Sequence, residues 1–135
     1  MSIKASPFAG PLTQLRTTPG VVQALVTAPD GFLVASAIEV DETVEVWAAV
    51  AAVFGKLGTK FIEAHQQTTL THAVFYAMNY SCIVMPVSIG LLLAVTTPEA
   101  ALESVCDRVF AVVRELETAV EGIHSTQGLE RSTHV

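Results

Sequence analysis

The chain has 135 residues, of which 51% are hydrophobic and only 15% are charged, and its formal net charge at pH 7 is −6. This length allows one domain with a core of its own. The acidic balance excludes a nucleic-acid partner, because the few Lys and Arg residues are scattered and form no basic face that could neutralise phosphates.

The N-terminal segment has no regular apolar period. The first 16 residues, MSIKASPFAGPLTQLR, lack the apolar core of a secretory signal, so we predict a cytoplasmic protein, and residues 1–10 are predicted to be a mobile tail. Leu12 to Thr17 can form one or two helical turns before Pro19-Gly20 stops them. The folded domain is therefore predicted to begin at residue 11.

A hairpin is the first clear structural signal in the sequence. Val21 to Thr27 and Phe32 to Ile38 are rich in β-branched and apolar residues, and the segment APDG separates them. Within this turn Pro29 presets φ, Asp30 can bond the local backbone, and Gly31 accepts a positive φ. We therefore predict two antiparallel strands joined by a tight turn.

A long helix is predicted next, from Glu42 to Ala64, with Asp41 as its N-cap. Its first half, VEVWAAVAAVF, is apolar almost all round, although a stripe about 100° wide is enough to cover one sheet face. One apolar face carries Val44, Trp47, Ala51 and Phe54, and the adjacent one carries Val46, Val50, Val53 and Leu57. We expect one of these faces to pack on the protein's own sheet and the other to meet a second molecule.

Three further strands are predicted at Thr68 to Ala77, Tyr80 to Val87 and Gly90 to Thr96, joined by short links. The apolar stretch from Ile83 to Val95 is shorter than the roughly 20 residues of a transmembrane helix and contains Pro86. No membrane insertion is therefore expected.

A last helix is predicted to begin near Pro98, because apolar residues recur at helical spacing from Leu102 to Val120. Gly122 is expected to end it, leaving residues 123–135 as a disordered polar tail and 11–122 as the domain. The element order is helix, two strands, helix, three strands, helix. It indicates an α+β fold whose hairpin-linked strands form a mainly antiparallel sheet.

A search for catalytic and metal-binding patterns finds none. The four histidines, at positions 65, 72, 124 and 134, are not spaced as metal ligands. Ser36 and Ser81 lack the glycines of a nucleophile elbow, and FGKLGTK lacks the ending of a phosphate loop. An acidic cluster around Asp41 could hold a cation, but capping of the following helix also explains it. We therefore expect no enzyme activity, no cofactor and no bound metal, and two free, buried cysteines.

Two segments carry a resemblance to a known family. In PGVVQALVTAPDGFLVAS, residues 19–36, Pro-Gly-Val opens a strand, Asp30-Gly31 makes the hairpin and Ala35-Ser36 ends the second strand. PVSIGLLLAV, residues 86–95, has a Pro, a short turn with Gly and a leucine-rich strand that leads into the last helix. With this element order, the chain resembles the roadblock family, small domains first associated with dynein light chains and also found in bacteria and archaea. The matched elements cover roughly residues 11 to 121.

The resemblance implies a roadblock/profilin-like α-β-β-α-β-β-β-α fold, with a five-stranded antiparallel sheet of order 2-1-5-4-3 between helices. It also implies a homodimer or a heterodimer, in which the third strands pair edge to edge and the second helices pack together. The residues agree, because the third strand would be a long edge with no lysine or proline to guard it. The predicted interface comprises Val46, Trp47, Val50, Val53, Phe54, Leu57, Leu70, His72, Val74 and Tyr76.

The function that the resemblance implies is that of a non-catalytic dimeric protein that binds and regulates a small Ras-like GTPase, by activating it or by scaffolding its switch regions. One alternative is a dimeric adaptor that joins other proteins regardless of nucleotide. A remote alternative is a small-molecule sensor, which would need a pocket with convergent polar groups between helix and sheet. The small residues Ala48, Ala49, Ala51 and Ala52 favour close packing there instead.

Overall fold

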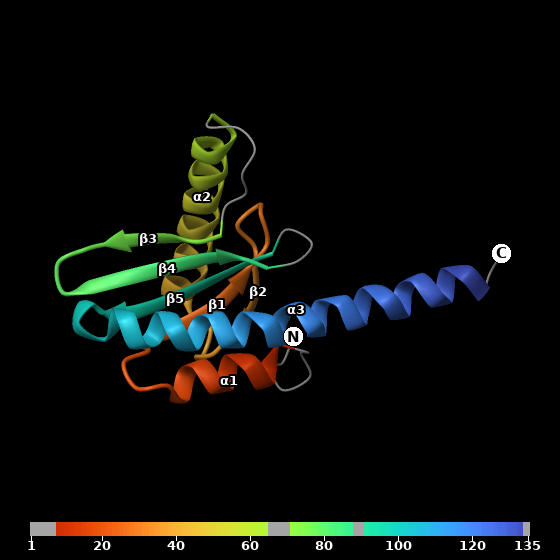
Figure 1. Ribbon diagram of the computed structural model, residues 1–135, viewed down its shortest axis with the longest axis horizontal. Coiled ribbons are helices and arrows are strands. Elements are labelled where there is room, and N and C mark those ends of the chain that lie inside the picture. Colours follow the sequence, from red (N-terminus) through yellow and green to blue (C-terminus); the bar gives the residue numbers. More distant parts are fainter. Residues whose placement is uncertain (1–7, 65–70, 88–90, 134–135) are drawn as a thin grey trace.

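A computed structural model describes residues 8–64, 71–87 and 91–133 of the chain. Its elements follow the predicted order (Figure 1): α1 (Ala9–Thr17), β1 (Gln23–Thr27), β2 (Leu33–Ser36), α2 (Glu42–Ala64), β3 (Ala73–Tyr76), β4 (Tyr80–Pro86), β5 (Leu92–Pro98), the 3-10 turn η3 (Glu99–Ala101) and α3 (Leu102–Thr133). The described strands form an antiparallel sheet of order β2-β1-β5-β4-β3. This order and the α+β class confirm the predicted fold.

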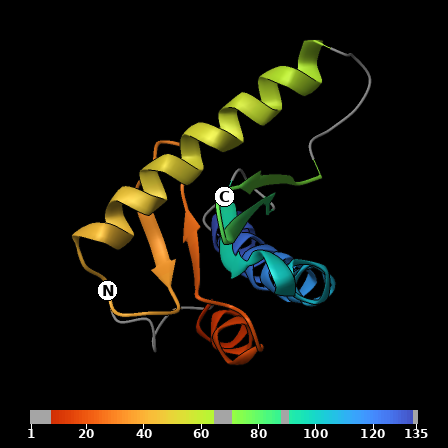
Figure 2. The same ribbon diagram turned by 90° about the vertical axis from the view of Figure 1, so that its left-hand side faces the viewer.

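Helices cover both faces of the sheet. α2 crosses one face, while α1 and α3 lie together on the other (Figures 1 and 2). The larger core cluster lies between the sheet and the α1/α3 pair and includes Leu12, Leu15, Ile83, Leu93, Val109 and Leu116. A second cluster lies under α2 and includes Leu25, Val44, Ala48, Ala51 and Val84. Removal of this apolar surface from water is the main force that holds the layers together.

The turn between β1 and β2 forms as its residues predict. The Phe32 N–H donates to Asp30 Oδ1 at 3.2 Å, and the Gly31 N–H donates to the Ala28 carbonyl at 2.9 Å. Gly31 has a φ of 95°, which a residue with a side chain rarely adopts. Asp30 and Gly31 therefore set the turn geometry.

The first turn of α2 and the short distance between this helix and the sheet also depend on particular residues. Asp41 caps the helix, since the Val44 N–H donates to its Oδ1 at 3.0 Å. Farther along, a Cβ built on Gly55 would lie 2.6 Å from Leu92 Cδ1 on β5. Gly55 therefore allows the helix to lie close to the sheet.

The chain ends differ from the sequence prediction. Residues 1–7 of the predicted tail lie outside the described residues, but Phe8 is buried and α1 begins at Ala9. At the other end α3 runs through Gly122 to Thr133, and its last turns extend past the sheet (Figure 1). A single glycine costs a helix only about 1 kcal/mol, so it does not force an end. The helix thus includes most of the segment that was predicted to be disordered, and residues 134–135 lie outside the described part.

Within the described part of the predicted strand Thr68 to Ala77, β3 covers Ala73–Tyr76, so Thr71, His72 and Ala77 lie outside it. It forms the outer strand beside β4, with Phe75 opposite Cys82. Residues 65–70, among them Leu70 of the predicted interface, lie outside the described residues.

Candidate protein-interaction surface

The outward side of α2 carries a row of exposed apolar side chains. Val46, Val53, Leu57 and Phe61 are between 55% and 64% exposed, and Val50 between them is half-buried. These five residues recur at spacings of three or four, which places them on one face of the helix. We call this row the α2 stripe.

The other apolar face of α2 packs on the sheet. Val44, Ala48, Ala51 and Gly55 are buried there. Trp47 is partly buried against the same core cluster, and its Nε1–H is buried without a hydrogen-bond acceptor among the described residues. The sequence prediction of two apolar faces on one helix is therefore confirmed, with Trp47 on the side that packs on the protein's own core.

An aromatic contact joins α2 to the edge of the sheet. The rings of Phe54 and Phe75 have centroids 3.8 Å apart and are tilted by 33°. Phe75 belongs to β3, the outer strand. The helix that carries the α2 stripe is therefore in direct contact with the outer strand of the sheet.

The side chains of the β3 edge alternate between the two faces of the sheet. Phe75 packs with the cluster under α2, whereas Val74 packs with the cluster under α1 and α3. By the same period of two, His72 and Tyr76 share the face of Val74. The His72 ring lies edge-on to Phe110 of α3 with centroids 5.3 Å apart. The predicted interface residues of β3 therefore lie on the face opposite to α2.

The predicted interface residues differ in exposure. Val46, Val53, Leu57 and Tyr76 are exposed, and Trp47, Val50, Phe54, His72 and Val74 are half-buried. Four exposed aromatic residues were not among the predicted interface residues: Phe32, Phe61, Tyr80 and Phe110. Phe61 follows Leu57 by four positions, so the helical spacing could have shown it. Phe110 has no comparable signal, because its exposure depends on how α3 sits on the sheet.

The titratable groups of the described residues were considered as metal ligands and as nucleophiles. Among them, no group of three or more His, Cys, Asp or Glu side chains is placed to hold a metal ion. Burial raises the pKa of the Cys82 thiol to about 12, so this thiol is not a nucleophile at neutral pH. Desolvation and the nearby Asp107 raise the pKa of Cys106 as well. Within the described part of the chain, no helix is long and apolar enough to cross a membrane.

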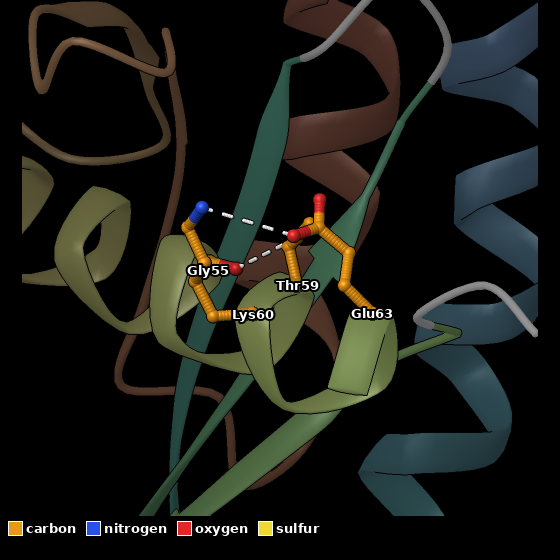
Figure 3. A network of polar contacts seen from close by, with 4 residues as sticks. All are labelled: Gly55, Thr59, Lys60 and Glu63. Atoms are coloured by element: carbon orange, nitrogen blue, oxygen red, sulfur yellow. Dashed lines mark hydrogen bonds and ion pairs between the residues drawn. The ribbon is translucent and has the colours of Figure 1, made fainter. Parts of the chain in front are cut away.

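A cavity of about 340 Å³ lies between the second half of α2 and the strand ends at Pro86 and Leu92. Its walls are mainly apolar, and its polar residues Thr59 and Lys60 both have partners on α2 itself (Figure 3). The Thr59 Oγ1–H donates to the Gly55 carbonyl at 3.0 Å, and Lys60 Nζ lies 3.7 Å from Glu63 Oε2. Close packing was expected at Ala48, Ala49, Ala51 and Ala52, of which Ala48, Ala51 and Ala52 are buried; the cavity lies farther along the helix, from Ala52 to Lys60. It does not show the convergent polar groups that a sensor pocket requires.

Comparison with solved structures identifies similar folds. MglB from Myxococcus xanthus has a TM-score of 0.70 at 16% identity, over 82% of this chain and 89% of that one. The gliding protein MglB from Thermus thermophilus has a TM-score of 0.72 at 16% identity, over 87% and 93%. A Roadblock/LC7 domain from Streptomyces avermitilis has a TM-score of 0.61 at 18% identity, over 84% and 91%. The chain has a roadblock-like fold.

The roadblock-like fold agrees with the resemblance seen in the sequence. No family model matches the chain, and no curated protein matches it. At 16–18% identity the structural likeness is a likeness of fold. What the fold does in this protein therefore has to be argued from its surface.

Proposed function

We propose that this chain forms a dimer through the α2 stripe and the β3 edge. The observation that carries the proposal is that the helix with the exposed stripe also contacts the outer strand, through the rings of Phe54 and Phe75. An isologous two-fold contact covers both features at once, since each copy offers the same patch. Full burial of a side chain such as Leu57 in this contact stabilises the dimer by about 1.5–3 kcal/mol.

The dimer in this proposal binds and regulates a small Ras-like GTPase. The roadblock-like fold supports this role, and so do the similar structures of MglB, one of which has a tetrameric arrangement. Regulation of this kind works by holding switch loops in a productive arrangement, which needs no catalytic group from the regulator. Two arginines of the chain are already engaged within it. Arg16 donates a hydrogen bond to the Ala37 carbonyl at 3.1 Å, and Arg108 donates one to Gln14 Oε1 at 3.2 Å.

Light scattering on matched variants tests the dimer. Leu57→Glu places a carboxylate in the α2 stripe and should convert the dimer to a folded monomer, because an unpaired charge is costly to bury. Lys56→Glu introduces the same side chain one position away, at an exposed site beside the cavity, and should leave the dimer intact. A dimeric Leu57→Glu protein, or a monomeric parent protein, would contradict this interface.

Binding to a Ras-like GTPase from the native host tests the regulatory role. The GTPase is loaded either with GDP or with a non-hydrolysable GTP analogue, and affinity and GTP hydrolysis are measured. We expect the two nucleotide states to differ in affinity by about tenfold or more, which corresponds to about 1.4 kcal/mol. Equal binding to both states with unchanged hydrolysis would favour the adaptor function instead. Absence of binding to either state would contradict the regulatory role for this GTPase.

A further inference from the structure

The cavity beside the second half of α2 has walls from three separate parts of the fold. One wall is the helix, with Ala52 and Gly55, and another is the turn between β1 and β2, with Pro29. The third is formed by the paired ends of β4 and β5, at Pro86 and Leu92. Its volume of about 340 Å³ lies within the range of small-molecule sites, roughly 300–1,000 Å³. The cavity can therefore hold a small ligand.

Close contacts hold these walls in place. A Cβ built on Gly31 would lie 3.3 Å from the Ala49 Cα, so the turn lies directly against α2. A Cβ built on Gly55 would lie 2.6 Å from Leu92 Cδ1, so the helix also lies directly against β5. A site whose walls are already ordered loses little conformational entropy when a ligand fills it. The cavity is therefore a preformed space.

Positive charge is concentrated at the mouth of this cavity. The lysines of the chain are Lys4, Lys56 and Lys60, and the last two line the cavity. They are exposed and lie four positions apart, so their stems can cover the apolar wall while their ammonium groups stay in water. In a chain with a net charge of −6, this arrangement places a local positive region beside an apolar space.

The two lysines differ in what they already bind. Lys60 Nζ lies 3.7 Å from Glu63 Oε2 (Figure 3). Lys56 has no ion pair or hydrogen bond with any residue that the structure describes. Asp30, in the turn that lines the cavity, accepts the Phe32 N–H within that turn. Lys56 is therefore the cation that is left to bind an anion at the cavity mouth.

The cavity and the α2 stripe use different sides of the same helix. The helix residues that line the cavity recur at spacings of one, three or four and share one side: Ala52, Gly55, Lys56, Thr59 and Lys60. Val53, Leu57 and Phe61 of the α2 stripe each follow one of them by one position, about 100° around the helix. The cavity is therefore a second feature of α2 that the proposed dimer does not explain.

The ligand that suits these walls has an apolar body and one negative charge. An apolar body gains affinity when it displaces loosely held water from an apolar wall. A carboxylate at the mouth meets the Lys56 ammonium and stays partly in water, so its desolvation costs little. A ligand with several polar groups, such as a nucleotide, needs several convergent partners, and the described walls do not offer them.

We infer that this cavity binds a small monocarboxylate with an apolar body, such as a medium-chain fatty acid. The hydrocarbon chain lies between α2 and Leu92, and the carboxylate lies at Lys56. This inference goes beyond the proposed function, because it gives the chain a small-molecule ligand at a place outside the α2 stripe and the β3 edge.

Titration with octanoate, followed by NMR of the backbone amides, tests the inference. The amides of Gly55, Thr59 and Leu92 should shift and reach half-saturation at or below about 1 mM. Octanol has the same hydrocarbon chain without the charge and should bind at least about threefold more weakly. Absence of shifts at these residues would overturn the inference. Equal affinities for octanoate and octanol would overturn the carboxylate and favour an apolar side chain of a partner protein as the occupant.

Two matched variants test the role of Lys56. Lys56→Gln removes the charge but keeps a long side chain, and it should weaken octanoate binding at least about threefold while octanol binding stays unchanged. Lys60→Gln removes the lysine that pairs with Glu63 and should change the affinity for octanoate by less than about twofold. A larger loss in Lys60→Gln than in Lys56→Gln would overturn the assignment of the carboxylate to Lys56.

Filling the cavity distinguishes a ligand from a second copy of the chain as its occupant. Ala52→Leu places a larger side chain in the cavity and should abolish detectable octanoate binding. Thr59→Phe fills the mouth from an exposed position, so it keeps the test valid if Ala52→Leu does not fold. Both variants should keep the parent's mass in light scattering. A folded variant that binds octanoate as the parent does would overturn the inference, and a lower mass would overturn it in favour of a second copy.

Discussion

α2 and α3 each cover one face of the same sheet, but they differ in what they leave outside. α3 buries Val105, Val109, Val112 and Leu116, and among its side chains up to Thr118 the large hydrophobic one on the outside is Phe110. α2 buries mainly small residues and leaves the α2 stripe exposed. α2 therefore carries more apolar residues than it needs to cover its own sheet, and the proposed dimer assigns the surplus to a contact with a second copy.

The difference arises because two helices cover one face of the sheet and a single described helix crosses the other. α3 lies beside α1, and polar bonds tie the outer sides of this pair together: Gln14 donates to Glu115 Oε2 at 2.8 Å, and Arg108 donates to Gln14 at 3.2 Å. Of the described helices, α2 is the one that crosses the opposite face (Figure 2). Its outer flank therefore has no neighbouring helix in the described part of the chain.

The largest difference in stability is expected when a buried valine of α3 and an exposed valine of α2 are each changed to aspartate. Val109→Asp puts a carboxylate into the core beneath α3, where Val109 is fully buried, and should destabilise the fold by about 3–5 kcal/mol or more. Val53→Asp in the α2 stripe should leave the unfolding free energy of the monomer within about 0.5 kcal/mol. Thermal unfolding followed by circular dichroism measures both. Similar losses in the two variants would break the comparison between the helices.

A middle-sized effect is expected at the joint between α2 and β3. Phe54→Ala removes the ring that contacts Phe75 and should lower the unfolding free energy by about 1–3 kcal/mol, since the ring is half-buried and part of an aromatic pair. Phe110→Ala is the control on α3, where the ring is more exposed, and should cost less than about 1.5 kcal/mol. Chemical denaturation gives both values. An equal or larger loss for Phe110→Ala would show that the aromatic contact on the α3 side holds β3 more strongly.

At pH values below 9 the smallest effect is that of the cysteine beneath α2, whose pH dependence begins only above pH 9. The pKa of the Cys82 thiol is about 12 in the folded chain against an ordinary value of 9.0, so the folded state favours the neutral thiol. Stability from this group is fully present below pH 9 and falls as pH rises from about 9 to about 12, by about 1.4 kcal/mol per pH unit at most. Cys82→Ala should remove this part of the slope in denaturation curves measured across that range.

Labelling with a thiol reagent at about pH 8 compares the accessibility of one cysteine on each face of the sheet. Half-buried Cys106 on α3 should react in the native state, and Cys82 should react only on unfolding. Fast native labelling of Cys82 would mean that α2 opens from the sheet.

Features that depend on neighbouring residues were predictable from the sequence. The turn at Asp30-Gly31 and the cap at Asp41 are set by bonds within a few residues. The two apolar faces of α2 follow from the helical period. The strand order, in contrast, needs contacts between distant segments, and it was supplied by the family resemblance.

Features set by the packing of distant segments were not predictable. The division of His72 and Phe75 between two faces follows from the strand period, but the contact of His72 with Phe110 depends on where α3 lies. Phe8 looked like part of a tail because its partners are far away in sequence. The helix through Gly122 shows that a local breaker signal is weak when the neighbouring residues favour a helix.

The long α3 has a practical consequence for measuring binding to this protein. Its backbone continues from Thr118 to Thr133, which adds roughly 20 Å of helix. Figure 1 shows that this end points away from both α2 and β3. A chain immobilised on a sensor surface by its C-terminus would therefore hold its domain off that surface, with the α2 stripe and the β3 edge open to an incoming partner.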